Sequence, residues 1–276
     1  MLDRIETAHP VPRANEPAFI EAQASTEPML RWSSWAFRMM QLLSVYLDCV
    51  RRTWKAIAKN PWVVLLPMLY GLVLGLALLL AAPLGILGGF LVGMIGTAVS
   101  ASFLYVVDEL VSGSPVRPRE LLLSVRRYFW PIMSVFFVFW VAQLLLSPLL
   151  TAPPHGTSIS IGLMAVLFVL LNATPEVIYQ KRTYGGLATL AESVSFIQRN
   201  WIEWLIPNIG FGAALWFGIP RLLALAPTGL GVLDFFAGPL LGGLLKGLVL
   251  FPIMLFRGHL FRELDRGIRN RVRYRP

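Results

Sequence analysis

The chain has 276 residues, of which 56% are hydrophobic and 14% charged, and its formal net charge at pH 7 is +9. So apolar a composition excludes an ordinary water-soluble surface and indicates that lipid is the surrounding solvent. The basic residues stand in short clusters between long apolar runs. This pattern indicates membrane topology and argues against nucleic acid as a partner.

The N-terminal segment mixes Pro, Ala, Glu and Arg without an apolar run, so we expect no signal peptide there. Residues 1–30 are predicted to be a disordered cytoplasmic tail, with a partner-docking segment as the alternative. The single cysteine, Cys49, excludes an internal disulfide and a cysteine-based metal cluster. It is predicted to be a small apolar residue, or else a site of reversible acylation at the membrane surface.

A transmembrane helix needs about 20 mostly apolar residues, and six stretches within a predicted transmembrane domain at 31–257 meet this requirement. We place these spans near 62–82, 84–107, 131–150, 158–179, 202–225 and 234–256. Short uncharged breaks with Pro or Gly, at 82–84 and 151–157, predict tight turns within two hairpins. Residues 258–276 are predicted to form a basic cytoplasmic tail.

Lys and Arg gather before the first span, between spans two and three, between four and five, and after the sixth, whereas the predicted turns carry none. Cytoplasmic loops of membrane proteins carry the excess of these residues. We therefore expect both termini in the cytoplasm, an even number of spans and a location in the bacterial inner (cytoplasmic) membrane. The side chains expected to face anionic lipid headgroups or a protein partner are Arg51, Arg52, Lys55, Arg126, Arg127, Arg266, Arg269, Arg271 and Arg273.

An amphipathic stretch that is too polar to cross a bilayer precedes each odd-numbered span, at 38–60, 118–130 and 187–199. Similar motifs end these stretches and predict an elbow before each odd-numbered span, namely NPW (60–62), FWP (129–131) and NW (200–201). In addition, GGFLVG (88–93) matches GGLLKG (242–247). The predicted fold is all-α, a polytopic membrane helical bundle of about six transmembrane helices. These form three parallel two-helix repeats, each preceded by an interfacial amphipathic helix. Alternatively, the units are not true repeats, and their motifs share Gly and Trp only because membrane helices favour these residues at these depths.

Several glycines stand four residues apart in the predicted spans and so lie on one face of a helix. Two backbones can approach closely there, and the resulting van der Waals contact drives helix association in lipid. We predict this helix-packing role for Gly71, Gly75, Gly89, Gly93, Gly243 and Gly247.

The three histidines, His9, His155 and His259, lie far apart in the sequence, and no HExxH, GxSxG or P-loop motif is present. We therefore expect neither an enzyme nor a bound cofactor or metal. Ionisable residues near the bilayer centre must pair, reach the interface or line a polar cavity. Lys246 is predicted to pair with Glu176, since a lysine stem can extend toward the interface. Together with Asn172 they are also the candidates for a substrate or ion site.

A longer pattern begins with PEVIYQ (175–180), continues with Gly185 and Gly186, and ends with the surface stretch ATLAESVSFIQRNW (188–201). This order resembles bacterial six-helix membrane proteins related to the membrane domain of glycerophosphodiester phosphodiesterases. GSPVRPREL (113–121) is similar to the earlier linker of that group. The resemblance implies two-span units joined by cytoplasmic surface helices. It implies no catalytic residue, because the chain has no phosphodiesterase catalytic domain.

Two functions fit these features. The first is a non-enzymatic integral inner-membrane protein of unknown specific role, whose cytoplasmic surface helices and basic tail organise the membrane or bind lipid or a partner protein. The alternative is a small transporter or permease subunit with a polar site around Glu176 and Lys246.

Overall fold

The computed structural model describes residues 40–151, 156–183, 185–213, 217, 221 and 232–273, apart from some side chains, among them those at 232–246 and 268–273. The predicted tail at 1–30 lies outside these residues, as do the side chains of Lys246, Arg269, Arg271 and Arg273. The chain divides into two units, Met1–Tyr46 and Leu47–Pro276. In the first unit the described residues, 40–46, are helical. The described elements of the second unit are all helices, as predicted, with no strand among them.

The second unit begins with the predicted surface helix, which extends from residue 47 to 59. It ends at Asn60, whose φ of −139° is not helical and whose side-chain amide donates a hydrogen bond to the Ala56 carbonyl oxygen at 3.4 Å. Pro61 follows, and because it lacks a backbone N–H the helix cannot continue unchanged. The chain instead enters a short 3-10 helix, η1 (Pro61–Leu65).

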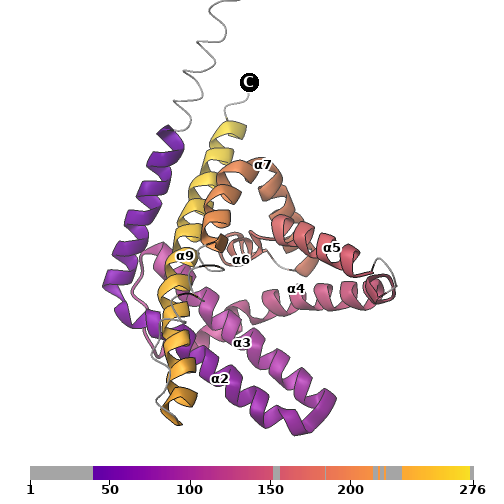
Figure 1. The fold of residues 1–276 in the computed structure, drawn as a ribbon. Helices are drawn as coiled ribbons and strands as arrows, with labels where there is room; N and C mark the ends of the chain where they lie inside the picture. Colours follow the sequence, from indigo (N-terminus) through magenta and orange to yellow (C-terminus); the bar gives the residue numbers. More distant parts are fainter. Residues whose placement is uncertain are drawn as a thin grey trace, which may run out of the picture. The chain divides into compact units, whose positions relative to one another are not determined.

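A hairpin of two long helices follows, α2 (Leu66–Ala81) and α3 (Gly85–Ser112), joined by the 3-10 turn η2 (Ala82–Leu84) (Figure 1). Gly85 makes the turn with φ 58° and ψ −125°, a conformation that glycine adopts at little cost. A Cβ atom at Gly88 would overlap the carbonyl oxygen of Ala81, so the two helices touch where only glycine fits. The predicted turn at 82–84 is confirmed.

The next helix, α4 (Glu120–Thr151), runs through the place where an elbow was predicted. The expected surface helix at 118–130 and the third span at 131–150 form one helix with Pro131 and Pro148 inside it. Pro131 removes one backbone donor, and Ser134 donates its hydroxyl to the Pro131 carbonyl oxygen at 2.8 Å. The elbow expected at the FWP motif is therefore absent.

The predicted fourth span is broken into α5 (Gly156–Leu170), α6 (Thr174–Glu176) and the π-helical η3 (Val177–Lys181). The first part, α5, and the second part, α6 with η3, are bent by 40° at the break between them. Pro175 lies at this point, where its missing N–H and its ring interrupt the helical hydrogen bonds.

The helix α7 (Gly186–Ala213) contains the predicted surface stretch at 187–199 and continues past it. It is kinked at Asn200, where φ is −134° and ψ is 28°. The Asn200 side-chain amide donates to the Phe196 carbonyl oxygen at 3.0 Å, four residues back, as Asn60 does at the first elbow. The elbow predicted at 200–201 is thus confirmed.

The last helix, α9 (Val232–Arg273), has 42 residues and is about 63 Å long at 1.5 Å per residue. The sequence divided this stretch into a span that ends at residue 256 and a basic tail from 258, but one helix crosses that boundary. Leu260 and Phe261 are fully buried, and the Phe261 ring stacks on Phe196 of α7 at 4.2 Å. The beginning of the predicted tail is therefore part of the core.

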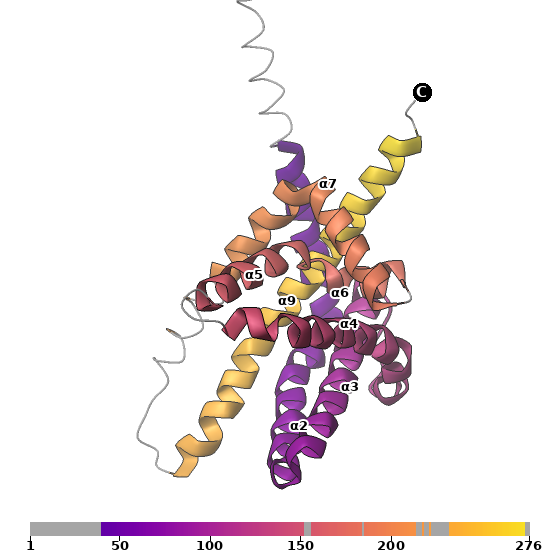
Figure 2. The same ribbon diagram turned by 90° about the vertical axis from the view of Figure 1, so that its right-hand side faces the viewer.

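The core of the second unit lies around the C-terminal half of α3, which contacts α2, α4 and α9. Its buried residues include Val106, Val107, Leu110, Phe251 and Leu255. From this core the α2–α3 hairpin and the α4–α5 pair diverge, and α9 passes beside them (Figures 1 and 2).

The described residues contain two segments long and apolar enough to cross a membrane, Pro61–Ser112 and Ser124–Pro148. A third, Gly156–Leu170 with Thr174–Lys181, qualifies if the bent pair counts as one span. The first segment has 52 residues, folds back at Gly85, and contains both stretches that were predicted as spans, 62–82 and 84–107. Helices that can span a membrane are thus present, whereas the arrangement of six spans in three repeats is not established.

Candidate functional site

Glu176, the last residue of α6, is a fully buried carboxylate with 0% of its surface exposed. Arg257 of α9 donates two hydrogen bonds to it, from Nε to Oε1 at 2.9 Å and from Nη2 to Oε2 at 3.0 Å. Paired donors of this kind satisfy both carboxylate oxygens at once and fix their orientation. The ion pair therefore joins the break after α5 to the last helix.

Asn172 and Trp204 complete the surroundings of the Arg257 guanidinium. Arg257 Nη2 also donates to the Asn172 carbonyl oxygen, and Trp204 Nε1 donates to Asn172 Oδ1 at 3.0 Å. The guanidinium carbon lies 5.2 Å from the centre of the Trp204 ring, within the range of a cation–π interaction. Backbone, amide, carboxylate and ring together enclose the charge.

These contacts bring together two of the three residues of the predicted polar site. Asn172 and Glu176 meet, whereas the side chain of Lys246 lies outside the described residues. The partner of Glu176 is Arg257, where the sequence suggested Lys246. A signal for this was present, because Arg257 directly follows the apolar run at 247–256, and a charge at the end of such a run is often paired inside the protein.

A second polar cluster connects the C-terminal part of α3 to α4. The Tyr128 hydroxyl donates to Asp108 Oδ2 at 2.6 Å. Arg127 lies 3.5 Å from Asp108 and 3.5 Å from Glu109. Asp108 is buried among these groups, so its charge is compensated within the protein.

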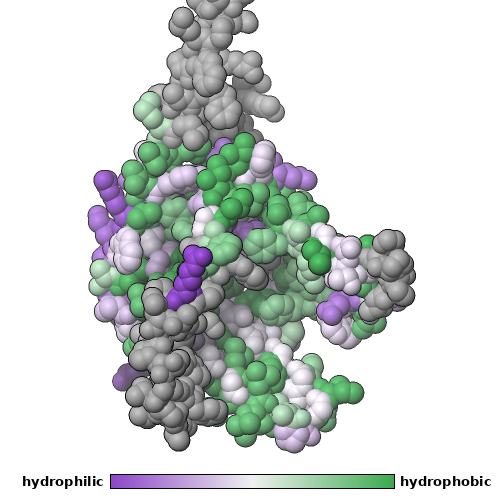
Figure 3. All heavy atoms as spheres, in the orientation of Figure 1, coloured by the Kyte–Doolittle hydropathy of each residue, from purple (hydrophilic) through white to green (hydrophobic). Residues whose placement is uncertain are grey.

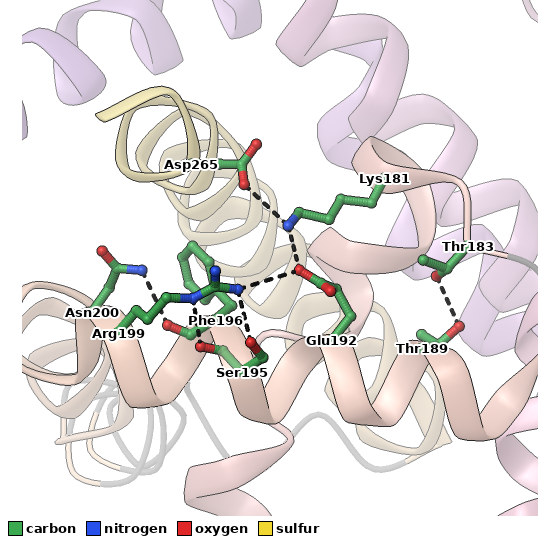
Figure 4. A network of polar contacts seen from close by, with 9 residues as sticks. All are labelled: Lys181, Thr183, Thr189, Glu192, Ser195, Phe196, Arg199, Asn200 and Asp265. Atoms are coloured by element: carbon green, nitrogen blue, oxygen red, sulfur yellow. Dashed lines mark hydrogen bonds and ion pairs between the residues drawn. The ribbon is translucent and has the colours of Figure 1, made fainter. Parts of the chain in front are cut away.

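A third cluster lies where η3, α7 and α9 meet (Figure 4). The Lys181 ammonium contacts Glu192 of α7 and lies 3.1 Å from Asp265 of α9. Arg199 approaches the same Glu192 at 3.6 Å and donates from Nη2 to Ser195 Oγ at 2.8 Å. The cluster holds the predicted surface stretch of α7 against the continuation of α9.

All three clusters are built as joints between helices. Each carboxylate named in them accepts a hydrogen bond or faces a cation, so none is available as a free acid or base. Among the residues that the structure describes, no group of three or more His, Cys, Asp or Glu side chains could hold a metal ion. The geometry of the clusters therefore supports cohesion of the fold.

A large open cavity lies between the diverging hairpins and has a volume of about 1100 Å³. Figure 3 shows the surface hollowed between the α2–α3 hairpin below and the α4–α5 pair at the right. Its walls are almost wholly apolar and come from α2, α3, α4, the break after α5, and α9. The polar lining residues are Tyr70, Ser100 and Thr174. Tyr70 shares a hydrogen bond with Ser102 behind the wall at 2.8 Å, and the buried Thr174 hydroxyl has no partner among the described residues.

The glycines predicted to mediate helix packing fall into two groups. At Gly71, Gly75, Gly89 and Gly93 an added Cβ would meet no atom within 4 Å, so these positions mark no close approach to another helix among the residues that the structure describes. At Gly247 an added Cβ would overlap the Val64 carbonyl oxygen, so α9 touches η1 there. Gly243 lies outside the described side chains. Gly71 and Gly75 instead line the apolar cavity.

The cations predicted to face lipid or a partner differ in their surroundings. Arg51 and Lys55 on the first surface helix and Arg126 on α4 are exposed. Arg52 is bonded to Glu263 at 2.7 Å, and Arg266 lies 3.9 Å from the same carboxylate. Arg127 belongs to the Asp108 cluster, and the remaining three have no described side chain.

Cys49 supports the simpler of its two predicted roles. It is 1% exposed, and burial together with the nearby Glu263 raises the pKa of its thiol to about 12. A buried, protonated thiol is a poor nucleophile, so Cys49 serves as a small apolar residue in this structure.

Comparison with known proteins finds no family model, no curated protein and no solved structure that matches this chain. The resemblance to the membrane domain of glycerophosphodiester phosphodiesterases therefore stays a prediction.

Proposed function

We propose that the chain is a non-enzymatic, multi-pass membrane protein that holds a lipid acyl chain in the apolar cavity between its hairpins. The observation that carries this proposal is the cavity itself, because most of its walls are built from the segments long and apolar enough to cross a membrane. An open cavity at that depth faces the hydrocarbon of the bilayer. Its almost wholly apolar walls offer water few hydrogen-bond partners. A lipid tail is the apolar ligand that the surroundings supply.

The outer surfaces of the same hairpins support a lipid environment. Ile86 is 95% exposed, and Leu80 and Leu87 are more than two-thirds exposed at the tip of the α2–α3 hairpin. In water, each exposed apolar Å² would cost about 25 cal/mol relative to burial. In lipid the cost disappears, so these faces suit contact with acyl chains.

The proposed placement is the bacterial inner membrane, with six spans in three units and both termini in the cytoplasm. The clusters of Lys and Arg support this orientation. The matching bonds of Asn60 and Asn200 to carbonyl oxygens four residues back support a common origin for two of the three units.

The transporter alternative is less well supported by the geometry. It requires a polar group that can bind a substrate or ion near Glu176, but both oxygens of that carboxylate are bonded to Arg257. The Asn172 amide oxygen accepts from Trp204. A substrate would have to displace these contacts.

Filling the cavity tests the proposal. The double variant Gly71→Leu with Gly75→Leu places two large side chains into open space on the cavity wall and should displace the lipid without a backbone clash. The lipid that copurifies with the protein in mild detergent is measured by mass spectrometry per mole of protein. We expect the double variant to retain less than about half of the lipid bound by the natural sequence, because the added side chains remove the apolar contacts that hold the tail.

The matched control is Gly89→Leu with Gly93→Leu. It adds the same atoms to α3 at two positions that are also open but do not line the cavity. Equal lipid content in the two double variants would contradict acyl-chain binding in this cavity.

A further inference from the structure

A second, smaller cavity of about 230 Å³ lies where the first surface helix meets the C-terminal end of α3. Its basic lining residues are Arg52, Lys55 and Lys59, which come from one helix, and His259 of α9 closes the other side. Asn60 and the loop after α3 complete the wall. No carboxylate is among its described lining residues.

The charge in this cavity is only partly balanced. Arg52 is bonded to Glu263 at 2.7 Å, but Lys55 and Lys59 form no ion pair or hydrogen bond with the residues that the structure describes. The first surface helix and α3 both end here, and each C-terminal end carries a partial charge of about −0.5. The two positive charges of Lys55 and Lys59 exceed this negative charge. The carbonyl oxygens at the end of α3 are also occupied, since Gly113 N–H donates to Leu110 O and Arg262 donates to Val111 O.

His259 supplies a neutral donor in the same cavity. It is 6% exposed, and its Nε2 atom has no hydrogen-bond partner among the described residues. Burial and the neighbouring Arg262 and Arg52 lower the pKa of His259 to about 4, so the ring is neutral at pH 7 and can donate from Nε2. A buried polar atom without a partner costs free energy unless a ligand satisfies it.

The position of the cavity suggests the source of such a ligand. The membrane-crossing segment Pro61–Ser112 begins directly after Asn60 and ends directly before Gly113, and both of these residues line the cavity. The cavity therefore lies at the edge of the bilayer, at the depth of lipid phosphates.

We propose that this cavity binds a phosphate group between Lys55, Lys59 and the Nε2 atom of His259. The group is carried by an anionic phospholipid headgroup or by free inorganic phosphate. The site is separate from the apolar cavity and does not depend on a tail being bound there. Strong hydrogen bonds from cations to phosphate oxygens supply the affinity.

The test uses the full chain in neutral detergent, with titration calorimetry against three probes: sodium phosphate, dihexanoyl phosphatidylglycerol, and dihexanoylglycerol, which lacks phosphate. We expect one or both phosphate-bearing probes to bind and the third not to bind. Binding of both assigns the site to phosphate itself, and binding of phosphatidylglycerol alone assigns it to a headgroup. No binding of either phosphate-bearing probe would overturn the proposal.

Two sets of variants localise the site. Lys55→Gln with Lys59→Gln, both on an exposed helix face, should weaken binding by about tenfold or more. His259→Leu should weaken it by at least about threefold. The charge-matched control, Arg51→Gln with Arg126→Gln, removes two exposed cations outside the cavity and should change affinity by less than about twofold. Equal loss in the two double variants would show only general surface attraction and would overturn the site.

The Gly71→Leu with Gly75→Leu variant separates this proposal from the proposed function. Phosphate binding should persist in that variant, because neither glycine lines the basic cavity. Loss of copurified lipid with intact phosphate binding supports both proposals. If one proposal fails, the other is still decided by its own variants and its own measurement.

Discussion

The Glu176–Arg257 pair shows what a single buried charge does in this chain. Taking a carboxylate out of water costs several kcal/mol, and its partner returns that energy only if the geometry is good. Here both oxygens are bonded at 2.9 and 3.0 Å, and Trp204 lies against the guanidinium. The pair therefore fixes where α9 lies beside the break after α5, and removing one partner leaves the other buried without its counter-ion.

Glu176→Gln should lower the free energy of unfolding by about 3–5 kcal/mol, because it leaves the Arg257 charge buried without its counter-ion. Unfolding is followed by circular dichroism as SDS is added to the protein in mixed micelles. The matched control is Glu109→Gln, whose partner Arg127 lies at 3.5 Å and is more exposed, with an expected loss of less than about 1 kcal/mol. Equal losses would contradict the special role of Glu176.

His259 makes stability depend on pH. Its pKa is lowered from 6.5 to about 4 in the folded protein, first by burial and then by Arg262 and Arg52, with Glu263 opposing them. The unfolded chain therefore binds the proton first as the pH falls. The stabilisation is fully present above pH 6.5, is lost as the pH falls toward 4, and amounts to about 3 kcal/mol.

The measurement compares unfolding in phosphate-free buffer at pH 7.5 and pH 5 for the natural sequence and for His259→Gln. The natural protein should lose more stability between these values than the variant, which has no group that titrates at this position. Parallel losses would assign the pH dependence to other residues.

At the scale of elements, the sequence predicted best where a residue stops a helix by its own chemistry. The turn at 82–84 and the elbows at Asn60 and Asn200 are present. In both elbows an asparagine leaves helical geometry and bonds its amide to the carbonyl oxygen four residues back. The FWP motif at 129–131 has no such asparagine, and α4 continues through it. A proline alone did not end the helix.

The parts that sequence could not predict depend on contacts between distant segments. Charge density suggested a tail after residue 257, yet Phe261 is buried because it stacks on Phe196 of α7. Likewise, the sequence places Glu176 near the bilayer and Arg257 at the end of an apolar run, but not the two together. Their pairing depends on α9 continuing as one helix past residue 257. Periodicity reports which face of a helix is apolar and not which helix it meets.

At the scale of the whole chain, orientation in the membrane depends on how many times the described helices cross it. Single cysteines, introduced with Cys49→Ala, report the side on which each position lies. Ala82→Cys and Ser158→Cys should react with a membrane-impermeant maleimide on intact bacterial cells. Arg126→Cys and Arg266→Cys should react only after permeabilisation, because positively charged loops stay in the cytoplasm.

Arg182→Cys decides how the bent pair at 156–181 crosses the membrane. If α5, α6 and η3 form one broken span, residue 182 lies on the same side as 126, and the cysteine reacts only in permeabilised cells. If the 40° bend instead returns the chain to the outer side as a re-entrant loop, the cysteine reacts in intact cells. We expect the first result, because Lys181 forms an ion pair with Asp265 at 3.1 Å, and Asp265 directly precedes Arg266 on α9.

This ion pair requires residues 182 and 266 to lie on the same side of the membrane, whichever side that is. Labelling of the two cysteines from opposite sides would contradict both the ion pair and the six-span topology.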